Sequence, residues 1–197
     1  QLYLNLLYKK DLTVLIKPQY VDTLSLLFEG SVEELFMKKN QRKNLPEVEK
    51  ILKTGKRPFA VTLSPDNNFL YVANVKSSDV SIFYLKDYKK VKTVKVGKSP
   101  YAIAFNKYGT KAFITNQHEN TISVIDTKTK KNIKTLDVGE YPEGINYYNK
   151  NKEVLVVNWF DSEVVVLNSE NLNIKKKISV GEGPRGFGYF IGPNLVK

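Results

Sequence analysis

The chain has 197 residues, of which 42% are hydrophobic and 26% are charged, and this balance excludes low-complexity and disordered classes of protein. The absence of cysteine excludes disulfide bonds, thiol catalysis, cysteine-ligated zinc and c-type haem attachment. There are 31 lysines and arginines against 20 aspartates and glutamates, and the formal net charge of +11 favours attraction to polyanions. No apolar run approaches the roughly 18–20 residues of a membrane-spanning helix, so no transmembrane segment is predicted.

Residues 1–54 are predicted to form a degenerate four-stranded unit. Residues 1–8 are a candidate for a strand that closes a ring or that belongs to another unit. The third predicted strand and the basic stretch after it are also compatible with a short helix. The four strands of the unit are expected at residues 12–17, 23–28, 32–37 and 47–53.

From residue 55 onward the sequence repeats with a period of 42 residues. Three residue types recur in one register, which is strong evidence for a structural repeat. We expect the glycine to supply a permissive backbone at a corner and the proline to fix φ at the start of the next strand. The recurring residues are Gly55, Gly97, Gly139 and Gly181, then Pro58, Pro100, Pro142 and Pro184, and also Asn74, Asn116 and Asn158.

Within each repeat apolar and polar residues alternate, which favours strands over helices. Four antiparallel strands in about 40–45 residues are typical of a β-propeller blade. In the repeat at 97–138 the strands are expected at residues 101–105, 111–115, 121–125 and 133–138.

The sequence therefore predicts an all-β chain, a β-propeller of four-stranded antiparallel blades. About four blades are visible, so the ring is small, or another chain completes it, or the chain is part of a longer protein with a larger ring. The units are the degenerate blade at 1–54, the blades at 55–96, 97–138 and 139–180, and the start of a further blade or closing strand at 181–197.

The end of each second strand resembles the Tyr-Val-Thr-Asn motif of the YVTN family of β-propeller repeats. The matching segments are residues 71–74, 113–116 and 156–158, and the strand at 120–126 and the closing Val-Gly-x-x-Pro strengthen the match. The resemblance implies a propeller of about seven blades in an exported protein, which we expect to be periplasmic or extracellular. The start at Gln1 fits a removed secretory signal.

Strand order places two kinds of loop on one face, which we call the top face: the Gly-x-x-Pro corners and the loops between second and third strands. Since the framework repeats, side chains that differ between equivalent loop positions give this face its individuality. An apolar Trp-Phe pair at a loop tip is typical of residues that anchor a partner, and packing on a neighbouring loop is the alternative. The predicted partner-binding residues are Arg57, Lys76, His118, Trp159, Phe160 and Arg185.

The opposite, bottom face is predicted to gather most of the excess lysines. A one-sided positive field steers polyanions such as nucleic acid, whereas a solvated lysine surface that serves solubility is the alternative. The predicted polyanion-binding residues are Lys86, Lys89, Lys90, Lys128, Lys130 and Lys131.

Motifs of the common enzyme classes are absent, so no catalytic residue, metal site or cofactor is predicted. His118 is the single histidine, and Glu119 or Asp161 are the acids that would orient it. The inner strands are mostly apolar, so no polar cluster is expected at the ring centre. We therefore expect a non-enzymatic binding or scaffold propeller whose partner is a protein or another chain of an assembly.

Two alternative functions stay open. Propellers related to the YVTN type occur as amine dehydrogenase subunits, d1-haem nitrite reductase domains and lactonases, so an enzyme or enzyme subunit is one alternative. Polyanion binding through the bottom face is the other, and its affinity would fall steeply with rising salt.

Overall fold

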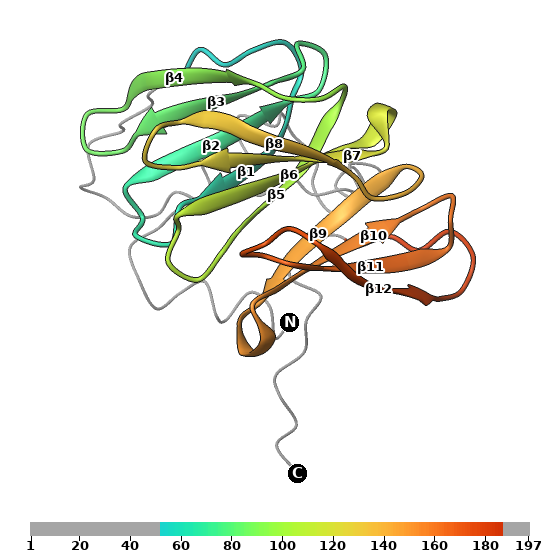
Figure 1. The fold of residues 1–197 in the computed structure, drawn as a ribbon. Helices are drawn as coiled ribbons and strands as arrows, with labels where there is room; N and C mark the ends of the chain where they lie inside the picture. The colour runs from blue at the N-terminus through green and yellow to red at the C-terminus, as the bar shows by residue number, and fades with distance from the viewer. Residues whose placement is uncertain (1–51, 187–197) are drawn as a thin grey trace, which may run out of the picture. The chain divides into compact units, whose positions relative to one another are not determined.

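The computed structural model describes residues 52–186 (Figure 1). Most of the predicted degenerate blade at 1–54, and residues 187–197 of the predicted last unit, lie outside the described residues. The described residues belong to the compact unit that begins at Lys50.

Three four-stranded antiparallel sheets make up the described part of the chain. In each sheet the strands are hydrogen-bonded in chain order, so every connection within a sheet is a hairpin. The first sheet consists of β1 (Pro58–Leu63), β2 (Phe69–Asn74), β3 (Asp79–Tyr84) and β4 (Lys89–Lys95). The second consists of β5 (Pro100–Phe105), β6 (Lys111–Asn116), β7 (Thr121–Asp126) and β8 (Lys131–Asp137). The third consists of β9 (Pro142–Tyr148), β10 (Glu153–Asn158), β11 (Glu163–Asn168) and β12 (Ile174–Ser179).

The helical content of the described residues is limited to two short 3₁₀ turns, Gln117–Glu119 and Asn149–Asn151. Within residues 52–186 no helix has the length and apolar character needed to cross a bilayer. The predicted all-β class with four-stranded antiparallel blades is confirmed. In the second sheet the observed strands lie within two residues of the predicted bounds.

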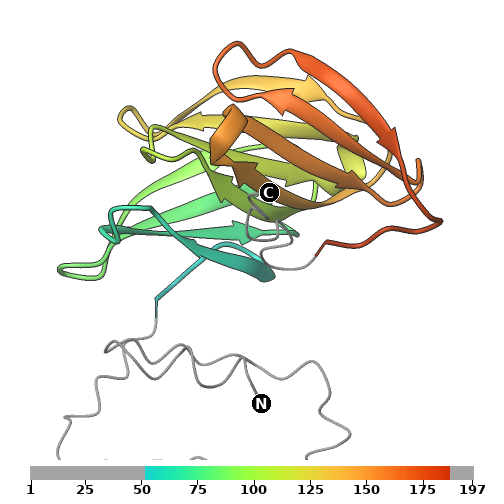
Figure 2. The ribbon, with the colours of Figure 1, turned by 90° about the horizontal axis from the view of Figure 1, so that it is seen from below.

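The hydrophobic core lies between neighbouring sheets, which follow one another in chain order (Figure 2). Between the first and second sheets, the Tyr71 and Phe105 rings meet edge to face with centroids 4.9 Å apart. Between the second and third sheets, Phe113 packs with Ile145 and other buried aliphatic side chains. A single sheet would leave the apolar side chains of both its faces exposed to water. Each blade is therefore stabilised by contact with its neighbours.

Equivalent positions show how much this packing depends on a neighbour. Ile103 and Ile145 occupy the same position of the 42-residue repeat as Val61. Both are buried against the sheet that precedes their own. Val61 lies on the first described sheet and is 61% exposed. A β-branched aliphatic residue at this repeat position is thus a core residue only where another blade covers it.

Crowding explains the corner glycine at position 97 better than its torsion angles do, whereas the corner glycine Gly139 has a φ of +116°. Gly97 has an ordinary negative-φ backbone, whereas Ser99 two residues later has a φ of +55°. A Cβ on Gly97 would lie 2.6 Å from the side chain of buried Asn116. The expected permissive backbone at the glycine is therefore wrong for this corner, since the left-handed position is the residue before the proline.

We predict that Gly97→Ala lowers the free energy of unfolding by about 1–3 kcal/mol, because the added methyl group overlaps a buried amide that cannot move away. Urea unfolding followed by tryptophan fluorescence measures this. Gly181→Ala is the matched control, since no atom of residues 52–186 lies within 4 Å of a Cβ built there. Equal destabilisation by the two substitutions would contradict the crowding explanation.

Candidate binding site

The two kinds of top-face loop are held together in each sheet by one repeated backbone hydrogen bond. The residue after the second strand donates its N–H to the carbonyl of the residue before the corner proline. The bonds are Val75 N to Arg57 O at 2.9 Å, Gln117 N to Ser99 O at 3.0 Å and Trp159 N to Tyr141 O at 3.1 Å. The loops that strand order places on one face are therefore physically joined.

A buried asparagine supports each of these corners from below. Asn74, Asn116 and Asn158 are fully buried at the ends of their strands. Each amide nitrogen donates to a side chain at the start of the third strand, which ties the ends of two strands together. The acceptors are Asp79 Oδ1 at 2.7 Å, Thr121 Oγ1 at 3.0 Å and Glu163 Oε1 at 3.3 Å.

The loop acids are committed to the backbone of the corners. Glu119 Oε2 accepts the N–H of Lys98 at 3.0 Å, and Asp161 Oδ2 accepts the N–H of Glu140 at 2.6 Å. His118 instead shares a hydrogen bond of 3.1 Å between its Nε2 and the Tyr141 hydroxyl. The acids considered as orienting partners of His118 therefore hold the loops in place, and the histidine is paired with a phenol.

Four aromatic rings gather where the top loops of the second and third sheets meet. Trp159 and Phe160 are stacked, with centroids 5.0 Å apart and planes 15° apart. Tyr141 lies against both, at 5.4 Å from Trp159 and 4.7 Å from Phe160, and its ring centroid is 5.4 Å from that of His118. We call these four residues the aromatic cluster. Its outermost ring, Phe160, is 60% exposed.

A charged pair adjoins the aromatic cluster. The guanidinium of Arg185 lies 4.2 Å from the centre of the Trp159 ring, a cation–π arrangement. Arg185 Nε also lies 3.7 Å from Glu143 Oε2. Glu143 is 2% exposed, and its other oxygen accepts a hydrogen bond of 2.9 Å from Gln117 Nε2. Burial raises the pKa of the Glu143 carboxyl, and the Arg185 charge partly opposes that rise.

Glu143 and Tyr141 are site residues that sequence reasoning missed. A signal existed for Glu143: it lies at the same repeat position as Phe59, Tyr101 and Arg185, directly after each corner proline. Residues at this position pair between neighbouring blades, since Phe59 and Tyr101 are also in ring contact at 4.2 Å. The sequence predicts mostly apolar inner strands and no polar cluster at the ring centre; the inner strand β9 does carry the buried polar residues Glu143 and Asn146.

The predicted top-face residues divide into two groups. His118, Trp159, Phe160 and Arg185 are brought together through Tyr141 and Trp159. Arg57 and Lys76 are exposed residues of the first sheet's corner, and within residues 52–186 no side-chain contact joins them to the cluster.

The predicted bottom-face lysines occupy turns and the first residues of outer strands. Lys86 and Lys128 are exposed turn residues, and Lys89, Lys90 and Lys131 lie in β4 and β8. The ammonium of Lys130 lies 4.6 Å from the centre of the Phe69 ring. The predicted polyanion-binding lysines therefore lie both on turns and on the outer strands β4 and β8.

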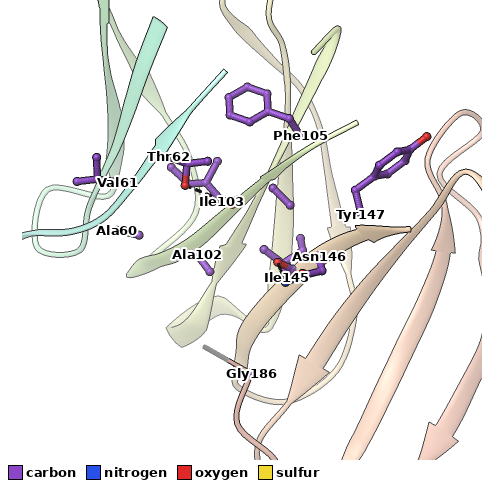
Figure 3. A pocket seen from close by; sticks show the side chains of 11 residues that line it. Ala60, Val61, Thr62, Ala102, Ile103, Phe105, Ile145, Asn146, Tyr147 and Gly186 are labelled. Carbon is purple, nitrogen blue, oxygen red and sulfur yellow. Dashed lines mark hydrogen bonds between the residues drawn. The ribbon is translucent and has the colours of Figure 1, made fainter. Parts of the chain in front are cut away.

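A cavity of about 500 Å³ lies beside the innermost strands β1, β5 and β9 (Figure 3). Its wall is mostly aliphatic, with Thr62, Asn146 and Tyr147 as the polar exceptions. Residues 52–186 contain no group of three or more acids or histidines placed to hold a metal ion.

Comparison with known proteins places the chain in a family. A model of the YNCE-like β-propeller family matches residues 44–190. The chain belongs to this family. The resemblance to YVTN-type propeller repeats seen in the sequence is thereby confirmed. A comparison with curated proteins found no match.

Solved structures similar to this YNCE-like propeller share its fold at low sequence identity. Hydrazine synthase from Kuenenia stuttgartiensis is 23% identical with a TM-score of 0.64, and the match covers 72% of this chain and 41% of that chain. The WD40 repeats of RRP9 are 10% identical with a TM-score of 0.61, covering 66% of this chain and 41% of that one. NirN, a dihydro-haem d1 dehydrogenase, is 16% identical with a TM-score of 0.56, covering 64% and 29%. The chain therefore spans less than half the length of these proteins.

We predict a specific pH dependence of stability from Glu143. Because its pKa is raised in the folded protein, the folded state binds this proton more tightly than the unfolded chain does. The free energy of unfolding should therefore fall as pH rises above the ordinary value of 4.5. Glu143→Gln removes this titration, so urea unfolding at pH 4.5 and 7.5 should show a smaller fall for the variant than for the wild type. An identical fall in both proteins would show that Glu143 does not titrate in this way.

Proposed function

We propose that this chain is a non-enzymatic binding propeller that presents its top-face loops to a protein partner outside the cytoplasm. The observation that carries the proposal is the aromatic cluster, with Phe160 60% exposed at its outer end. The location is supported by the family, since YNCE-like propellers are often extracellular or periplasmic.

The cluster has the composition of an interface anchor. Tryptophan, tyrosine and arginine are the residues most enriched among those that dominate binding energies at protein interfaces. Trp159, Tyr141 and Arg185 occur together here and contact one another. An apolar ring surrounded by groups that can still hydrogen-bond is the usual arrangement of a buried interface core with a polar rim.

The repeat provides an internal comparison for this assignment. Val75, Gln117 and Trp159 are equivalent, as are Lys76, His118 and Phe160. All three sheets make the same corner bonds, so the fold does not require aromatic residues at these positions. The third sheet alone among those described carries the Trp-Phe pair, which supports a role specific to that loop.

The rigidity of the corners also favours binding. Each top loop is held by a backbone hydrogen bond, a side-chain acceptor and a buried asparagine. Loops that are already ordered lose little conformational freedom when a partner binds. The alternative function, an enzyme subunit, is supported by likeness of fold alone. The binding function is supported by these particular side chains.

The experiment compares partner recovery by the wild type and by variants of matched exposure. The immobilised chain is incubated with extracellular and periplasmic proteins of its own source, and bound proteins are quantified by mass spectrometry. We predict that Phe160→Ser reduces recovery of a top-face partner about 30-fold, which is the loss of a typical hot-spot residue.

Tyr108→Ser is the control, since Tyr108 is a 76% exposed aromatic residue of the turn between β5 and β6, at the opposite end of the strands. It should leave recovery unchanged. A set of bound proteins that Phe160→Ser does not alter, or that Tyr108→Ser alters equally, would refute a binding role for the aromatic cluster.

A further inference from the structure

The outer strands β4, β8 and β12 form a basic edge on every described sheet. Each is the last strand of its sheet, at the side farthest from the innermost strands (Figure 1). Together they contain nine lysines and one acidic residue, Asp137. We call these three strands the outer rim. The lysines are Lys89, Lys90, Lys92 and Lys95 in β4, Lys131 and Lys134 in β8, and Lys175, Lys176 and Lys177 in β12.

One lysine of the outer rim recurs with the 42-residue period. Lys92, Lys134 and Lys176 are all exposed, and each lies opposite a buried aliphatic residue of the neighbouring strand. Within residues 52–186, no carboxylate lies within salt-bridge distance of these three ammonium groups. Other rim lysines are neutralised, for example Lys95 by Asp79 at 3.7 Å and Lys177 by Glu163 at 2.8 Å. Within the described residues the repeated lysines are therefore free of a direct ion pair, a property that Lys90 and Lys131 share.

Beside each repeated lysine the outer strand carries a β-bulge. The register shifts fall at Ile82/Phe83, Val124/Ile125 and Val166/Leu167. The extra residue is Val91 in β4 and Ile133 in β8, and these side chains are 43% and 51% exposed. Bulges and lysines together keep a sheet edge from pairing with another strand. That protection explains the charge and the bulge, but it does not explain the exposed aliphatic side chains at the bulges of β4 and β8; the extra residue of the β12 bulge is Lys175.

We propose that the outer rim binds the surface of a membrane that contains anionic lipids. Lysines near such a surface are attracted by the headgroup phosphates, and exposed valine and isoleucine side chains gain by leaving water at the headgroup boundary. β4 and β8 contact one another, so the lysines and aliphatic residues of the two strands are available to the same membrane surface. A single-stranded nucleic acid is a poorer match, since β4, β8 and β12 contain no aromatic side chain for bases to stack on.

The test uses cosedimentation of the chain with vesicles of phosphatidylglycerol and phosphatidylcholine, with vesicles of phosphatidylcholine alone as the neutral comparison. The chain should sediment with the anionic vesicles only, and its affinity should fall as salt rises. The variant Lys92→Gln/Lys134→Gln/Lys176→Gln should bind about fivefold more weakly per lysine, on the order of 100-fold in total. If the triple variant does not fold, Lys134→Gln alone should still show the fivefold loss.

The matched control is Lys107→Gln/Lys128→Gln/Lys150→Gln, which removes the same charge from exposed turns. It should weaken binding by no more than about threefold, because salt screens charges that lie away from the lipid surface. Val91→Ser/Ile133→Ser should weaken binding without changing its salt dependence.

Three results would overturn the proposal. The first is equal sedimentation with neutral vesicles. The second is equal loss in the two lysine variants, which would indicate a response to net charge alone. The third is binding to single-stranded DNA with none to anionic vesicles, which would assign the rim to another class of polyanion.

Discussion

The top face depends on one repeated contact, the buried asparagine side chain packed against a corner glycine. Asn116 lies under Gly97 so closely that a Cβ would overlap it, and its amide nitrogen holds the start of the next strand. Asn74 and Asn158 do the same in the sheets on either side. Leaving a buried amide donor without a hydrogen-bond acceptor costs free energy. Breaking this contact is therefore unfavourable, and the loop stays in place once the contact has formed. The variable residues of the top face are thereby held on an invariant support.

The repeat made the fold predictable from the sequence, because the same physical requirements recur every 42 residues. Proline begins β5 and β9, and asparagine ends β6 and β10, as the register predicts. The reason for the glycine was not predictable in the same way. Its neighbour in space, Asn116, lies 19 residues away in the chain, and only the folded corner shows that a methyl group has no room.

The candidate site was predictable in part. The exposed Trp-Phe pair was visible because a repeat shows which loop departs from the others. Tyr141 and Glu143 were not, since their roles come from contacts across sheets: Tyr141 with His118 of the second sheet, and Glu143 with Gln117 of that sheet and with Arg185. The sequence predicts basic residues on the bottom face, whereas in the structure exposed lysines also follow the outer strands β4, β8 and β12.

Hydrogen exchange of the top-loop amides tests the central claim, that the repeated corners hold the binding loops rigid. The decisive amides are those of Val75, Gln117 and Trp159, which donate to the corner carbonyls. We predict that these three amides exchange as slowly as the strand amide of buried Val124, because opening a corner requires breaking the buried asparagine contact. Exchange as fast as that of the exposed turn residue Lys128 would contradict it, and would mean that the top face is a set of independent, mobile loops.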